Sequence, residues 1–111
     1  MNKGGKVTNI ELLYFDGCPS YQTALKYLGE VLKEKSLNLP VKMIKIAGND
    51  DALKHRFLGS PTIRINGLDI EPGAEEIRAF SMRCRLYIED DAMSEWPSKK
   101  MIAQAIDSAI K

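Results

Sequence analysis

Cys18 and Cys84 are the residues of this chain with the most distinctive chemistry. Cys18 stands in FDGCPSYQTALKYL, where an apolar run gives way to a helical pattern that begins at Pro19. The thiolate form of cysteine attacks disulfides and binds soft metals, and a helix N-terminus favours that anion through its unpaired N–H groups and its dipole. We therefore predict that Cys18 is a reachable nucleophile at the N-cap or beside it. The alternative is a small buried spacer.

The residues around Cys18 predict a strand followed by a helix. Residues 7–15 contain an apolar run without alternation, which is typical of a central strand covered on both faces. The helical stripe consists of Tyr21, Ala24, Leu25, Leu28, Val31 and Leu32. A second strand is expected at residues 41–46, parallel to the first, with a short helix after it.

The segment SPTIRINGLDIEP, residues 60–72, predicts a β-hairpin. Asn66 and Gly67 form the preferred pair for a two-residue type I′ turn. With that turn, the facing pairs are Ile65 with Leu68 and Ile63 with Ile70 on one face, and Arg64 with Asp69 on the other. The charges of Arg64 and Asp69 are opposite, so the pattern and the register agree.

The remaining residues predict a helical turn, a strand, a loop and a last helix. Residues 74–80 suit a short helical turn, and residues 89–96 suit a loop. The apolar stripe of the last helix is Met101, Ile102, Ala105, Ile106, Ala109 and Ile110.

Between that turn and that loop, MRCRLYI alternates as a strand does. The alternation places Cys84, Leu86 and Ile88 on an inward face and Arg83, Arg85 and Tyr87 on the other. This pattern favours a structural, inward-facing Cys84. The alternative is a thiol that resolves a mixed disulfide on Cys18.

The order of these elements resembles the thioredoxin superfamily, in which the nucleophilic cysteine begins the first long helix and a cis-proline precedes the third strand. GCPSY at residues 17–21 and SPT at residues 60–62 stand in those two places. The resemblance covers nearly the whole chain apart from residues 73–96. It implies one thioredoxin-like α/β domain over residues 1–111, with a mixed four-stranded sheet flanked by helices. Residues 1–6 are expected to be flexible.

The resemblance also implies the roles of individual residues. Cys18 would be the nucleophile and a cis Pro61 would lie beside it. The expected substrate-binding residues are Pro19, Ser60, Pro61 and Thr62. The backbone of Ser60 would then be exposed and free to pair with an extended partner chain.

A narrower resemblance is to small bacterial thioredoxin-like proteins with a GCP motif, some of which carry the label alkylmercury-lyase-like. The matching residues are FLGSPTIRINGLDIEP at 57–72 and CRLY at 84–87.

Tyr21 stands where a dithiol enzyme of this family has its resolving cysteine. Its expected role is core packing, with a hydroxyl that steadies a thiolate as the alternative. A mixed disulfide on Cys18 would therefore be released by Cys84 or by an external thiol such as glutathione. We expect thiol–disulfide exchange with protein or small-molecule thiols and disulfides, without a resident metal or cofactor. The alternatives are capture of a soft metal or organomercurial by the two cysteines and a redox-silent interaction module.

Composition bears on the remaining classes of function. The 111 residues suffice for one hydrophobic core, and 16 basic against 15 acidic residues give no general reason to expect nucleic acid or an anionic membrane as partner. No apolar segment has the length of a signal peptide or a membrane span. We therefore expect a cytoplasmic monomer or weak dimer, in which both cysteines rest as thiols and any disulfide is transient.

Overall fold

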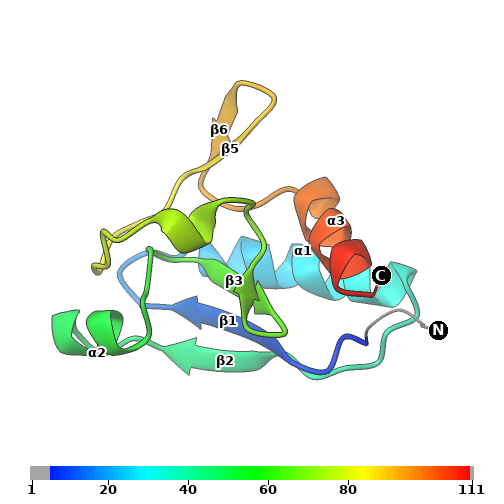
Figure 1. The fold of residues 1–111 in the computed structure, drawn as a ribbon, viewed down its shortest axis with the longest axis horizontal. Coiled ribbons are helices and arrows are strands. Elements are labelled where there is room, and N and C mark those ends of the chain that lie inside the picture. The colour runs from blue at the N-terminus through cyan, green and yellow to red at the C-terminus, as the bar shows by residue number, and fades with distance from the viewer. Residues whose placement is uncertain (1–5, 111) are drawn as a thin grey trace.

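The computed structural model describes residues 6–110, which form a four-stranded mixed sheet, a two-stranded sheet and three α-helices (Figure 1). The strands are β1 (Ile10–Tyr14), β2 (Lys42–Lys45), β3 (Thr62–Ile65), β4 (Leu68–Asp69), β5 (Tyr87–Glu89) and β6 (Ala92–Ser94). The helices are α1 (Tyr21–Glu34), α2 (Asn49–Lys54), α3 (Lys99–Ile110) and the short 3₁₀ turn η1 (Ala74–Glu76). The predicted α/β class with a mixed four-stranded sheet is confirmed. Of residues 1–6, which were expected to be flexible, residues 1–5 lie outside the described residues.

Strand β1 lies inside the larger sheet, whose order is β2-β1-β3-β4. It pairs parallel with β2, as predicted, and antiparallel with β3. Leu12 and Leu13 are both fully buried, because successive side chains of a strand point to opposite faces of its sheet. The prediction of a central strand covered on both sides is therefore confirmed.

A different layer covers each face of this sheet. Helices α1 and α3 pack against each other and against β1 and β3, and the core between them includes Leu12, Leu28, Ile63 and Ile102. On the opposite face, Leu13 packs in a smaller cluster with Ile46, Ala52 and Phe57, in and around α2. No helix within residues 6–110 is both long enough and apolar enough to cross a bilayer.

The β3–β4 hairpin has the predicted turn and register. Asn66 and Gly67 have φ angles of 54° and 84°, and both must be positive in a type I′ turn. Ile65 pairs with Leu68 and Arg64 with Asp69. Since local sequence dictates both the turn and the alternation, this hairpin was predictable without knowledge of the remaining fold.

Arg64 and Asp69 are paired in register as predicted, and Asp69 interacts electrostatically with Arg64, but the hydrogen bonds of the two side chains go to other partners. Arg64 Nη2 donates to the carbonyl oxygens of His55 and Arg56, at 2.7 and 3.1 Å. The Asp69 carboxylate instead accepts two hydrogen bonds from Arg85. Arg85, which is distant in sequence, therefore makes the hydrogen bonds to Asp69 that the local pattern suggested for Arg64.

The predicted strand over MRCRLYI is also largely wrong, because β5 begins only at Tyr87. The inward and outward faces are reversed as well. Arg85 and Tyr87 are buried, at 5% and 2% exposed, whereas Leu86 and Ile88 are 53% and 61% exposed. The side chains of residues 85–88 do alternate between two faces, but the buried face is the one that carries the charged side chain of Arg85.

Residues 89–96 are not the predicted loop, because they contain the turn of a second hairpin and its strand β6. Asp90 and Asp91, between β5 and β6, have φ angles of 52° and 66°. The hairpin projects away from the larger sheet (Figure 1). The sequence contains no Asn-Gly pair at this turn, so the usual signal for a two-residue hairpin was missing.

Candidate functional site

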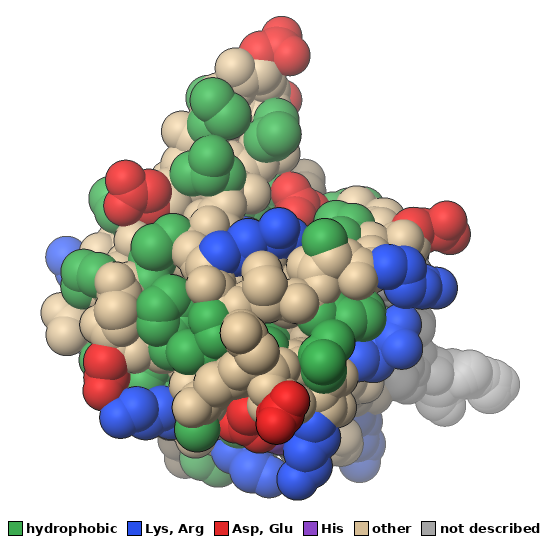
Figure 2. Space-filling view, turned by 90° about the vertical axis from the view of Figure 1, so that its left-hand side faces the viewer, with side chains coloured by type: hydrophobic (Ala, Val, Ile, Leu, Met, Phe, Trp, Pro, Cys, Tyr) green, Lys and Arg blue, Asp and Glu red, His purple; other side chains and the backbone are tan. Residues whose placement is uncertain are grey.

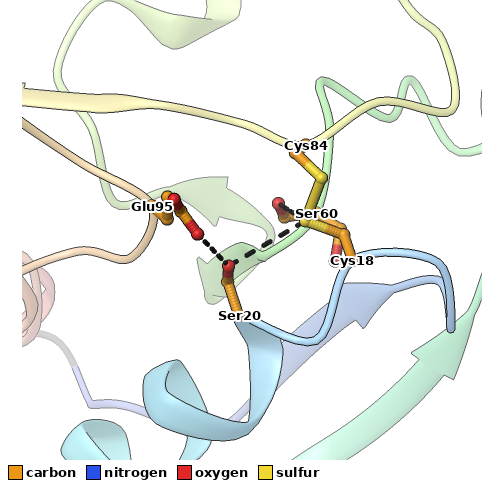
Figure 3. The surroundings of a disulfide bond; sticks show 5 residues. All are labelled: Cys18, Ser20, Ser60, Cys84 and Glu95. Carbon is orange, nitrogen blue, oxygen red and sulfur yellow. Dashed lines mark hydrogen bonds between the residues drawn. A yellow bond between two sulfur atoms is a disulfide. The ribbon is translucent and has the colours of Figure 1, made fainter.

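A disulfide bond joins Cys18 to Cys84, whose Cα atoms are 5.7 Å apart (Figure 3). The Ser60–Pro61 peptide beside the bond is cis, as the resemblance implied. Cys18 Sγ lies 3.6 Å from the carbonyl oxygen of Ser60 and 3.9 Å from Ser20 Oγ. The structure thus brings together both cysteines and the Ser-Pro pair, which are far apart in sequence.

Cys18 lies in the turn between β1 and α1, where its N–H donates to the carbonyl oxygen of Phe15. The N-cap of α1 is Ser20, so the prediction that Cys18 is the N-cap or its neighbour is wrong. The reason is that the carbonyl oxygen of Pro19 accepts the N–H of Gln22, three residues ahead, in a tighter turn that precedes the regular helix. Pro19 itself is exposed.

The two halves of the disulfide differ in burial. Cys18 is 2% exposed, whereas Cys84 is an exposed residue. The prediction that Cys18 is the reachable sulfur is therefore wrong for this disulfide-bonded form. The prediction that Cys84 faces inward is wrong too, because this residue is exposed.

The cysteine segment, residues 83–85, lies alongside Ser60 as a short parallel bridge. The N–H of Ser60 donates to the carbonyl oxygen of Arg83 at 2.8 Å, and the N–H of Arg85 donates to the carbonyl oxygen of Ser60 at 2.9 Å. Both backbone groups of Ser60 are thus occupied. The expectation that they are free for a partner chain is wrong, because this chain's own segment uses them.

Gly59 permits the close approach of the cysteine segment. Its φ is +124°, and a Cβ at this position would lie 2.9 Å from Arg85 Cβ and 3.0 Å from the carbonyl oxygen of Arg83. Residues other than glycine rarely adopt such a φ and would also clash here. The segment and the loop before Pro61 therefore fit each other only with glycine at this point.

Thr62 and Tyr21 are both occupied by contacts within the chain. Thr62 is fully buried, and its Oγ1 donates to the carbonyl oxygen of Gly59 and accepts from Arg85 Nη1, at 2.6 and 3.0 Å. It therefore supports the cysteine segment rather than lining an open groove. The ring of Tyr21 stacks on that of Tyr14 with centroids 4.3 Å apart, an arrangement in keeping with the packing role expected for it.

Arg85 is the site residue that sequence reasoning misplaced. Its Nη1 and Nη2 lie 2.7 and 2.8 Å from the two carboxylate oxygens of Asp69, and Nη2 lies 3.0 Å from Glu71 Oε1. Burial alone would lower the pKa of Arg85, but hydrogen bonds to these carboxylates raise it above its ordinary value. The arginine therefore stays charged although it is buried. The alternation of residues 82–88 had placed Arg85 on the outward face, whereas its side chain is buried.

Tyr87 covers this arginine and connects β5 to the proline. Its hydroxyl donates to the carbonyl oxygen of Pro61 at 2.6 Å, and the guanidinium carbon of Arg85 lies 4.4 Å from the centre of its ring. Burial raises the pKa of Tyr87, so the phenol remains a neutral hydrogen-bond donor.

A polar connection runs from the buried sulfur toward solvent. Ser20 Oγ, beside Cys18 Sγ, donates to Glu95 Oε1 at 3.1 Å (Figure 3). Ser20 is buried and Glu95 is exposed. Sequence reasoning did not find this pair, since 75 residues separate its members and no local motif links them.

Within residues 6–110, no group of three or more His, Cys, Asp or Glu side chains is placed to bind a metal ion. Comparisons of the chain with models of protein families, with curated proteins and with solved structures gave no match. The geometry of the site is therefore what bears on the function of this chain.

Proposed function

We propose that this protein is a thioredoxin-like thiol–disulfide redox protein in which Cys18 and Cys84 are the exchanging pair. The observation that carries the proposal is the bond between these cysteines beside the cis Ser60–Pro61 peptide. The position of Cys18 after β1 and of Pro61 before β3 supports a thioredoxin-like arrangement. A fold does not imply a function, but two sulfurs within bonding reach can exchange electrons with an external thiol or disulfide.

Cys84 is the exposed residue of the pair and Cys18 the buried one, so we place the first step of exchange at the sulfur of Cys84. An external thiolate attacks Cys84 Sγ, the disulfide breaks, and Cys18 leaves as a thiolate with the electron pair. A second external thiolate then attacks the external sulfur of the mixed disulfide and releases Cys84. The protein disulfide is reduced, and two external thiols are oxidised to one disulfide. In the reverse direction, the Cys18 thiolate is the nucleophile that displaces the partner from Cys84.

The surroundings of Cys18 are suited to a sulfur that gains and loses a proton. The hydroxyl of Ser20 rotates freely about its C–O bond, so it can donate either to Glu95 or to a thiolate on Cys18. When Cys18 is a thiol, Ser20 Oγ and the carbonyl oxygen of Ser60 are acceptors within reach. Exposed Glu95 connects this pair to water.

The experiment is reduction of a fluorescent peptide disulfide by glutathione, with and without the protein. We expect the wild-type protein to accelerate exchange, and Cys18→Ser and Cys84→Ser each to abolish the acceleration. Ser108→Ala, at an exposed position of α3, is the control and should behave as wild type. Wild-type protein without any acceleration would contradict the proposal.

Capture of a soft metal is the second candidate, because the same convergence of sulfurs suits a two-coordinate thiophilic ion. Reduced wild-type protein would then take up one equivalent of mercuric ion, and each Cys→Ser variant would bind it more weakly. Tight uptake without accelerated exchange would favour capture over redox catalysis.

A further inference from the structure

Arg85 attaches the cysteine segment to the sheet through an unusually complete set of contacts. Its side chain is 5% exposed and donates to both carboxylate oxygens of Asp69, to Glu71 and to Thr62 Oγ1. Asp69 belongs to β4 and Thr62 to β3, so the guanidinium connects the residue next to Cys84 to two strands of the larger sheet. A planar fork of donors is well suited to such paired binding.

Regular secondary structure gives Cys84 little support. It precedes β5 and belongs to none of the strands of residues 6–110, and it pairs with Ser60 through an isolated bridge. When the disulfide opens, Cys84 is held by that bridge and by the contacts of the residues next to it in the chain. Arg85 makes the most numerous of these contacts, and Tyr87 adds a bond to the carbonyl oxygen of Pro61.

We infer that Arg85 is a positioning residue that keeps the Cys84 thiol beside Cys18 in the reduced protein. The disulfide of the protein is thereby favoured over mixed disulfides with external thiols, since a thiol already in place reacts at a high effective concentration. This inference uses the same cysteine pair as the proposed function and deepens it. It concerns an equilibrium, so it does not depend on whether the protein turns over a partner.

The equilibrium is a balanced exchange with glutathione. One protein disulfide and two glutathione thiols give two protein thiols and one glutathione disulfide. The Cys18–Cys84 bond breaks, a bond between two glutathione sulfurs forms, and the two protons pass to the protein sulfurs. The ratio of oxidised to reduced protein at a known glutathione composition measures how strongly the chain favours its own disulfide.

Arg83 provides a matched control, because it flanks Cys84 on the other side and is exposed. Its side chain donates to the carbonyl oxygens of Leu58 and Ala79. Arg83→Gln and Arg85→Gln therefore remove the same charge at the same distance along the chain from the sulfur. They differ in whether a buried guanidinium bound to carboxylates is lost.

Each variant is equilibrated in glutathione buffers, quenched with acid and labelled with a maleimide to count thiols. We expect Arg85→Gln to lower the equilibrium constant for disulfide formation about ten- to a hundredfold, the effect of losing one or two charge-assisted hydrogen bonds. Arg83→Gln should stay within about threefold of wild type, as exposed charges usually contribute little. Arg85→Lys should recover part of the loss, because it keeps the charge but not the fork. Equal constants for wild type and Arg85→Gln would overturn the inference.

Hydrogen exchange on reduced wild-type protein tests the inference if Arg85→Gln fails to fold by circular dichroism. The N–H of Arg85 is bonded to the carbonyl oxygen of Ser60, and we expect it to remain protected after reduction with a phosphine. Protection that falls to the level of a free peptide upon reduction would contradict the inference, because the segment would then depend on the disulfide alone.

The two experiments distinguish failure of the positioning role of Arg85 from failure of the proposed redox function. Without accelerated exchange of the peptide disulfide, the function fails, while a weakened disulfide in Arg85→Gln still supports the positioning role. With full acceleration and an unchanged equilibrium constant in Arg85→Gln, only the positioning role fails.

Discussion

The regions that carry the two cysteines are stabilised by different means. Cys18 follows β1, a strand paired on both sides and buried on both faces, and precedes α1, which packs on the core. Cys84 is exposed and lies before a two-stranded hairpin that projects from the larger sheet. Strand pairing and apolar packing position the first sulfur, whereas an isolated bridge with Ser60 and the buried side chains of Arg85 and Tyr87 position the second.

Beyond Tyr87, which is buried in the core, the projecting hairpin adds little apolar burial to the Cys84 region. Ile88 and Met93 face each other across β5 and β6 and are 61% and 69% exposed. Figure 2 shows hydrophobic side chains along this hairpin and acidic ones at its tip. Regions with few buried apolar contacts open at lower free-energy cost than the core. The comparison teaches that apolar packing fixes one partner of the disulfide, whereas the polar contacts of Arg85 hold the segment that carries the other.

The largest effect should come from a cavity in the core under β1, the strand that precedes Cys18. Leu12→Ala removes a fully buried side chain from the core between β1 and the helices. We expect the free energy of unfolding to fall by about 2–5 kcal/mol, measured by urea denaturation. Leu86→Ala, near Cys84 and 53% exposed, should change it by less than about 0.5 kcal/mol. If Leu12→Ala and Leu86→Ala lowered the free energy of unfolding equally, the proposed difference in packing between the Cys18 and Cys84 regions would be contradicted.

Opening the disulfide should have the next largest effect. The bond closes a loop between residues 66 positions apart, so reduction should lower the free energy of unfolding by about 2–4 kcal/mol through the greater freedom of the unfolded chain. Urea denaturation with and without a phosphine reductant measures the difference. Cys84→Ser should reproduce the loss and be insensitive to the reductant. A reductant that destabilises Cys84→Ser would indicate a cause other than this bond.

Alkaline pH should weaken the attachment of the Cys84 region through Tyr87. Because burial raises the pKa of Tyr87 in the folded state, the neutral phenol is favoured by folding. This stabilisation is fully present below about pH 10, the ordinary tyrosine pKa, and decreases above it by about 1.4 kcal/mol per pH unit. The stability advantage of wild type over Tyr87→Phe should therefore shrink between pH 10 and 11 and stay constant between pH 7 and 9. A constant advantage up to pH 11 would contradict the assignment.

The smallest effect is expected on the exposed face of the projecting hairpin. Ile88→Ala and Met93→Ala remove side chains that are mostly in water. Each should change the free energy of unfolding by about 0.5 kcal/mol or less, as measured by thermal or urea unfolding of the oxidised protein. Losses above about 2 kcal/mol would show that this face is buried in solution.

The sequence by itself determined the elements whose causes are local. The type I′ turn at Asn66 and Gly67, the register of β3 with β4 and the buried stripe of α1 follow from turn chemistry and from the repeat of apolar residues. The expected cis Pro61 beside Cys18 came from resemblance to a family, and the structure places it there.

Only the tertiary structure decided which face of residues 82–88 is buried and which of the two cysteine residues is exposed. An alternating pattern defines two faces but does not say which one meets the core. Here Asp69 and Glu71, brought close by the β3–β4 hairpin, compensate the charge of Arg85 and turn it inward. A buried charge is tolerated only with such partners. Because the partners lie 14 and 16 residues away, no local window of sequence contains the reason.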